Sequence, residues 1–180
     1  VMGDPSNLTN HLLIAMPSLA DPNFAQSVTY LCEHNDEGAL GIVINRPAGI
    51  QVGELLEHLD IQVNDPAVSE RPVFAGGPVQ RERGFVLHRP VGDWEACRAV
   101  TEELAVTTSR DILEAIARGG GPAEWLLALG YAGWSAGQLE EELGDNAWLN
   151  GPATADILFR QPPEGRWEAA AAMLGVDLNR

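Results

Sequence analysis

The chain has 180 residues, with 26 acidic side chains against 11 basic ones, all of them arginine, and a formal net charge of −15. A chain of this length buries roughly 70% of its unfolded surface, so we expect one domain over residues 1–180 that folds without disulfides or a metal. The strong negative charge repels nucleic-acid phosphate and anionic lipid, which makes direct binding to nucleic acid or to a membrane surface unfavourable.

The N-terminal region does not have the pattern of a secretory signal, because residues 1–10 hold no basic group and the apolar stretch that follows ends at Pro17. The longest weakly polar run, residues 125–134, is far shorter than the roughly 20 residues that span a bilayer. We therefore expect a cytoplasmic protein without a membrane-spanning segment, and a flexible N-terminal tail over residues 1–8.

The first half of the chain has the alternation and the turn residues of extended structure. The pattern predicts strands over residues 11–16, 27–34, 39–45, 73–75 and 85–88, with two shorter extended pieces between 97 and 107. The second and third strands form a hairpin, and both faces of the second are apolar, which indicates a central strand. One short amphipathic helix is predicted over 52–59, with Leu55, Leu56 and Leu59 as its buried stripe.

The second half carries clearer helix signals. One predicted helix is capped by Thr108 or Ser109 and ends at Gly119, and a second follows a capping box formed by Ser135 and Gln138. A third follows the two prolines at 162–163, and the apolar stretch at 125–131 is predicted to be a buried strand. Strands followed by mixed strands and helices indicate an α+β fold, not regular βαβ winding.

Four segments are characteristic in their order and sequence: residues 13–47, residues 76–88 (GGPVQRERGFVLH), residues 104–122, and residues 129–143 (LGYAGWSAGQLEEEL). With these segments, and with the NAWL stretch at 146–149 after them, the chain closely resembles the AlgH/YqgE family of bacterial proteins over essentially its full length. The resemblance implies a single domain whose mainly antiparallel sheet bends into a barrel-like body with several short helices packed around it. The AlgH name belongs to a proposed regulator of exopolysaccharide (alginate) gene expression, and the family has no established catalytic activity.

The main site hypothesis rests on polar and cationic side chains at the ends of predicted elements. If the hairpin end and the helix that starts near 109 meet, a polar pocket for a small anion results. The candidate ligand pocket comprises His34, Asn45, Arg46, His88, Thr108, Ser109 and Arg110. The alternative is that the residues at 107–111 satisfy the free N–H groups of their own helix, while Arg110 pairs with an acid.

Cys32 and Cys97 lack metal-ligand spacing and lie in apolar, strand-like settings, so we interpret them as buried reduced thiols, with a redox pair as the alternative. Cys32 and His34 share a strand face, which permits a common ion, but the sequence has no zinc-finger spacing and no nucleophile elbow. We therefore predict no catalytic residues, no metal and no cofactor.

Two further features are interpreted as structural. The Gly76-Gly77-Pro78 stretch is a tight turn between strands, because Pro78 has no N–H group to offer a phosphate. Three cations, Arg81, Arg83 and Arg89, fall within nine residues and are interpreted as a solvated strand rim, with a phosphate-binding patch as the alternative.

The leading functional hypothesis is a non-enzymatic regulatory or adaptor protein that acts through a protein partner or a small ligand, with an indirect effect on transcription. The alternative is an enzyme, or a protein that binds a nucleotide or another small anion, with its pocket near Arg46 and Arg110. We expect a monomer, because the chain has no sustained heptad pattern and no long apolar edge.

Overall fold

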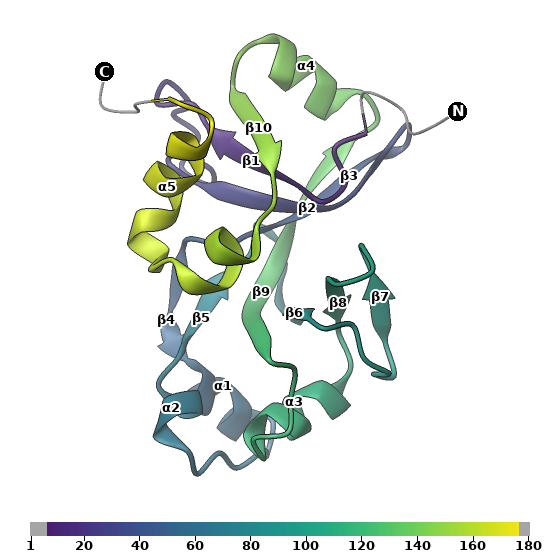
Figure 1. Cartoon of the computed structure of the whole chain (residues 1–180), viewed down its shortest axis with the longest axis vertical. Helices are drawn as coiled ribbons and strands as arrows, with labels where there is room; N and C mark the ends of the chain where they lie inside the picture. The colour runs from purple at the N-terminus through teal and green to yellow at the C-terminus, as the bar shows by residue number, and fades with distance from the viewer. Residues whose placement is uncertain (1–6, 177–180) are drawn as a thin grey trace.

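The computed structural model describes residues 7–176 and consists of a curled, ten-stranded sheet with short helices around it (Figure 1). The strands are β1 (His11–Ala15), β2 (Val28–Asn35), β3 (Gly38–Val43), β4 (Pro47–Gln51), β5 (Pro72–Ala75), β6 (Val79–Arg89), β7 (Cys97–Ala99), β8 (Ala105–Thr107), β9 (Glu124–Ser135) and β10 (Trp148–Pro152). The α-helices are α1 (Val52–His58), α2 (Pro66–Ser69), α3 (Arg110–Ala117), α4 (Gln138–Gly144) and α5 (Arg166–Met173), with a π-helix at Asp156–Arg160 and a 3-10 turn at Pro163–Gly165. The predicted α+β class and the bent, mainly antiparallel sheet are confirmed.

Strand β9 organises the sheet, because it is the longest strand and has three partners. Its first half pairs with β5 in parallel, its second half pairs with β3, and β6 lies antiparallel along its other edge. Gly130 separates the two halves and has a φ of +78°. A Cβ on this residue would stand 2.5 Å from the carbonyl oxygen of Gly77, so the bend in β9 and the close approach of the 76–78 turn both require glycine here.

The sheet is covered on both faces. The concave face holds the main core, which takes residues from β1, β2, β3, β5, β6, β8 and β9 and is filled by the π-helix and α5. A second core lies where α1 and α3 pack Leu56 and Ile112 against Val86 and Leu127 of the sheet. A third lies under α4, whose Leu139 is buried with two tryptophans. In Figure 1, α1, α2 and α3 gather at one end of the molecule and α4 at the other.

Several local expectations differ from the structure. Leu8, placed in the predicted tail, is buried in the third core, and residues 1–6 of that tail lie outside the described residues. Leu59 is 38% exposed, because α1 ends one residue before it. Strand β4, helix α2 and the π-helix carry no periodic signal of their own and were not expected.

The predicted caps also form differently. Ser109 is the N-cap residue of α3, but its hydroxyl accepts a hydrogen bond from the N–H of Ala96 and does not cap the helix. Before α4, Gln138 reaches back to the N–H of Ser135 at 2.9 Å as a capping box requires, while Gly137 is the N-cap residue. No helix within residues 7–176 is long and apolar enough to cross a bilayer.

Candidate functional site

Arg46 follows β3, and its guanidinium is directed toward the loop that connects β1 to β2. It donates hydrogen bonds to the backbone carbonyls of Pro22, Asn23 and Ala25. Burial lowers the pKa of the guanidinium, and the nearby carboxylate of Asp21 acts in the opposite direction. These hydrogen bonds hold the loop against the end of the sheet. Arg46 therefore stabilises the loop in addition to carrying a positive charge.

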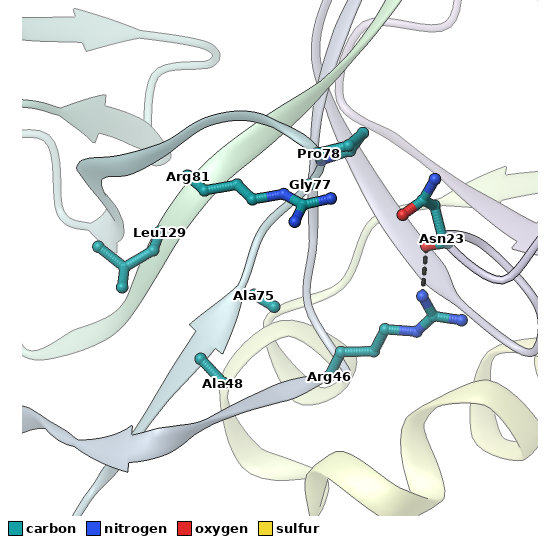
Figure 2. A pocket seen from close by; sticks show the side chains of 8 residues that line it. All are labelled: Asn23, Arg46, Ala48, Ala75, Gly77, Pro78, Arg81 and Leu129. Atoms are coloured by element: carbon teal, nitrogen blue, oxygen red, sulfur yellow. Dashed lines mark hydrogen bonds between the residues drawn. The ribbon is translucent and has the colours of Figure 1, made fainter.

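The loop, the start of β4 and the 76–78 turn enclose a pocket of about 270 Å³, which we call the arginine pocket (Figure 2). Its eight lining residues come from segments far apart in the sequence: Asn23, Arg46, Ala48, Ala75, Gly77, Pro78, Arg81 and Leu129. Figure 2 shows Arg81 reaching across the pocket toward Gly77 and Pro78, with Arg46 and Asn23 together on the opposite side.

An irregularity in β6 brings Arg81 to this pocket. Val79 pairs with Tyr131 and Gly84 pairs with Leu129, so four residues of β6, 80–83, stand opposite the single residue Gly130. Gln80 takes a φ of +49° as the chain leaves the regular ladder. Bulges of this kind redirect side chains, and here Arg81 is turned into the arginine pocket.

The turn at Gly76 and Gly77 forms another wall. A Cβ at Gly76 would lie 2.4 Å from the carbonyl oxygen of Gly130, and one at Gly77 would lie 2.1 Å from the carbonyl carbon of Tyr131. The glycines therefore allow the turn to pack against the β9 backbone. This agrees with their interpretation as a structural turn.

Two arginines in one pocket stand out in a chain with a net charge of −15. None of the eight lining residues is acidic. Within residues 7–176, Arg81 makes no ion pair, whereas Arg89, Arg98, Arg110 and Arg160 each lie within 4 Å of a glutamate. A guanidinium that is free of carboxylates and faces a pocket retains its donors for an anion.

The structure places the other predicted pocket residues in several different locations. Asn45 lies beside Arg46, and its amide bridges the backbone of Gln26 and Val28. His34 is buried at the far end of β2, where its Nδ1 accepts the N–H of Leu8 and its Nε2 lies 3.3 Å from a carboxylate oxygen of Glu140. Both side chains hold loops in place and do not line the arginine pocket.

His88 is fully buried in β6, with Nε2 2.7 Å from the hydroxyl of Thr107 and Nδ1 3.0 Å from the carbonyl of Pro90. Burial lowers its pKa. Arg110 is exposed on α3 and lies 3.8 Å from Glu114, the acid-paired arrangement that was the alternative interpretation of this helix start. Ser109 bridges Ala96 and Asp111.

The remaining candidates lie near a second cavity. Thr108 and Cys32 line a pocket whose lining residues include neither Arg46 nor Arg110. Cys32 and Cys97 are both free thiols, and each donates a hydrogen bond to a backbone carbonyl. Burial raises the pKa of the Cys32 thiol to about 12, against the opposing effect of Arg98.

Of the predicted pocket residues, Arg46 therefore lines the arginine pocket, whereas Arg110, His34 and His88 lie elsewhere. Of five pockets within residues 7–176, none is lined by both Arg46 and Arg110. Arg81 also lines the arginine pocket, although the sequence pattern indicates a solvated strand rim for the three arginines at 81–89, with a phosphate-binding patch as the alternative. Nothing in the sequence indicates that a bulge directs it toward the β1–β2 loop.

The comparisons with known proteins agree with this architecture. A family model described as AlgH-like matches residues 12–179. A UPF0301 protein of Thioalkalivibrio sulfidiphilus is 63% identical over 174 residues, covering 97% of this chain and 93% of that protein. Another UPF0301 protein, from Nitrosococcus oceani, is 57% identical over 171 residues, covering 95% of this chain and 91% of that protein.

Solved structures agree as well. The solution structure of the AlgH protein from Pseudomonas aeruginosa, 53% identical, superposes with a TM-score of 0.83 and covers 99% of this chain and 95% of that one. A crystal structure of protein DIP2367 from Corynebacterium diphtheriae, 20% identical, shares the fold with a TM-score of 0.75 and covers 98% of this chain and 92% of that one. The chain belongs to the AlgH-like family.

Proposed function

We propose that this protein is a cytoplasmic, non-enzymatic regulatory protein that binds a small oxyanion, a phosphate or carboxylate group, in the arginine pocket. The observation that supports this most directly is that Arg46 and Arg81 face one cavity that no acidic residue lines. In a chain of net charge −15, a pocket lined by two cations and no acid repels an anion less than the acidic surface does.

The two arginines have different tasks in this proposal. Arg46 donates its hydrogen bonds to the carbonyls of the β1–β2 loop, so it contributes mainly positive charge to the pocket. Arg81 has no carboxylate partner within residues 7–176, and its planar fork suits two oxygens of one oxyanion. Asn23 lies on the opposite side of the pocket, where its polar side chain can contact a bound group (Figure 2).

The size and chemistry of the pocket support binding of a small group. Its volume of about 270 Å³ lies just below the range of cavities that enclose drug-sized ligands, roughly 300–1,000 Å³. The lining side chains offer donors and positive charge, and none of them is a nucleophile or a general base. A ligand here would connect the β1–β2 loop to the β6 bulge. Ligand binding would then regulate the protein by changing how these two segments are held together.

The test is a calorimetric titration of the protein with inorganic phosphate and with citrate, at constant ionic strength set with chloride. We expect saturable binding of at least one of them, and a thermal stabilisation of about 2.7 kcal/mol at a hundred times its Kd. Arg81→Gln should weaken binding at least about tenfold, because a charge-assisted hydrogen bond is lost.

Arg118→Gln is the matched control, since Arg118 is exposed at the end of α3 and has no ion pair within residues 7–176. It removes the same charge far from the arginine pocket and should leave the Kd unchanged. Equal weakening by the two variants, or no saturable binding of either anion, would refute the proposal.

A further inference from the structure

A second pocket, of about 300 Å³, opens where the curl of the sheet closes on itself, and we call it the mouth pocket. In the sheet order, β3, β9, β6 and β8 separate β2 from β7. The curl nevertheless brings the two strands together, and Arg98 of β7 donates to a carboxylate oxygen of Glu33 on β2 at 2.8 Å. Both residues line the mouth pocket.

The interior of this pocket is continuous with the main core. Phe85 and Val106 are core residues, and Cys32 and Tyr131 pack against them as partly buried members of the same cluster. The rings of Phe85 and Tyr131 meet edge to face, with centroids 5.7 Å apart. The main core is thus accessible here, at the open end of a barrel-like sheet, which is a common position for ligand sites.

The rim of the mouth pocket is positively charged. Arg83 and Arg98 contribute two positive charges and Glu33 one negative charge, so the charges among the lining residues sum to +1. Arg98 is paired with Glu33, whereas Arg83 has no carboxylate partner within residues 7–176. Its guanidinium lies 5.5 Å from the centroid of the Phe85 ring and contacts the amide oxygen of Gln80 at 3.4 Å.

We propose that the mouth pocket binds an organic acid with an apolar tail or ring, with the apolar part against Phe85, Tyr131 and Cys32 and the acidic group on Arg83. An apolar interior explains burial of the hydrocarbon, and a cation beside it explains selection for an acid over its neutral analogue. The site is distinct from the arginine pocket, because the same β6 bulge sends Arg81 to that pocket and Arg83 to this one.

The experiment is a calorimetric titration with decanoate, and with 1-decanol as the neutral probe of equal chain length, below the concentration at which either aggregates. Decanoate should bind saturably and at least about tenfold more tightly than decanol, the difference expected from one charge-assisted hydrogen bond.

Three variants separate this proposal from general charge effects. Arg83→Gln should weaken decanoate about tenfold, while Glu33→Gln should tighten it several-fold, since it removes the rim's negative charge and frees Arg98. Arg118→Gln should leave it unchanged. A contribution of these residues to folding alone would not change affinity in opposite directions, and thermal melts of each variant establish that it is folded.

The proposal is overturned if decanoate does not bind, if decanol binds equally well, or if Arg83→Gln and Arg118→Gln weaken decanoate equally. Arg81→Gln distinguishes the two pockets, because it should weaken phosphate or citrate and leave decanoate unaffected. Loss of decanoate binding in Arg81→Gln but not in Arg83→Gln would also overturn the assignment to the mouth pocket.

Discussion

Trp134 of β9 and Trp148 of β10 donate their indole N–H groups to the same oxygen of Glu142, at 3.1 and 2.9 Å. The two rings meet edge to face with centroids 6.1 Å apart, and the other oxygen of Glu142 accepts from the Gln138 amide. One carboxylate on α4 therefore satisfies two tryptophans on strands that β1, β2 and β3 separate in the sheet order.

We expect Glu142→Ala to lower the free energy of unfolding by about 2–4 kcal/mol, because it leaves two largely buried indole N–H groups without a partner. Glu141→Ala, on the exposed face of the same helix, should change it by less than about 0.5 kcal/mol. Urea unfolding followed by tryptophan fluorescence measures both. Similar effects of the two substitutions would show that the indole bonds contribute little.

The ion pair between Glu33 and Arg98 should contribute little stability, although it joins two ends of the curl. The side chains are 37% and 69% exposed, and exposed pairs contribute about 0–1 kcal/mol. Arg98→Gln is expected to lower the free energy of unfolding by less than about 1 kcal/mol, with the difference shrinking as salt is added. A larger, salt-independent loss in chemical denaturation would contradict this.

Gly77→Ala should destabilise the fold strongly, by about 3 kcal/mol or more, because the new methyl would overlap the Tyr131 backbone at a φ of +156°. The matched control is Gly144→Ala at the end of α4, where a Cβ meets nothing within 4 Å. That control should be neutral or stabilising by up to about 1 kcal/mol. Melting temperatures of the two variants provide the comparison, and equal values would contradict the packing argument.

His88 should make stability depend on pH. Because burial lowers its pKa in the folded state, the unfolded chain takes up the proton first as the pH falls below about 6.5. The contribution of neutral His88 is therefore present above that pH and is lost as the pH falls through the folded pKa, with a slope of at most about 1.4 kcal/mol per pH unit.

The measurement is urea unfolding of the wild type and of His88→Asn between about pH 7 and pH 5. The variant should show a shallower loss of stability, whatever its absolute stability, because the other histidines are common to both proteins. Parallel pH profiles for the two proteins would show that His88 does not titrate as expected.

Local sequence patterns predicted much of the fold. The alternation of Val28, Tyr30 and Cys32 with Thr29, Leu31 and Glu33 predicted a central strand with two apolar faces, and β2 lies between β1 and β3 with both faces packed. The helix at 110–117 was also predicted, because Ile112 and Ile116 recur at helical spacing and both are buried. Strand β4 and the π-helix were missed, since contacts with distant segments stabilise them.

The sequence by itself indicated the family, through the resemblance carried by its four characteristic segments. It also determined the α+β class and the residue types available for a site, because periodicity and composition are local properties of the chain. Only the tertiary structure decided that Arg46 faces Arg81 and not Arg110, that His34 and His88 are committed to internal hydrogen bonds, and that Arg83 reaches a different pocket from Arg81. These outcomes depend on the curl of the sheet and on the β6 bulge, which arise from pairing between strands distant in sequence, so no local pattern records them.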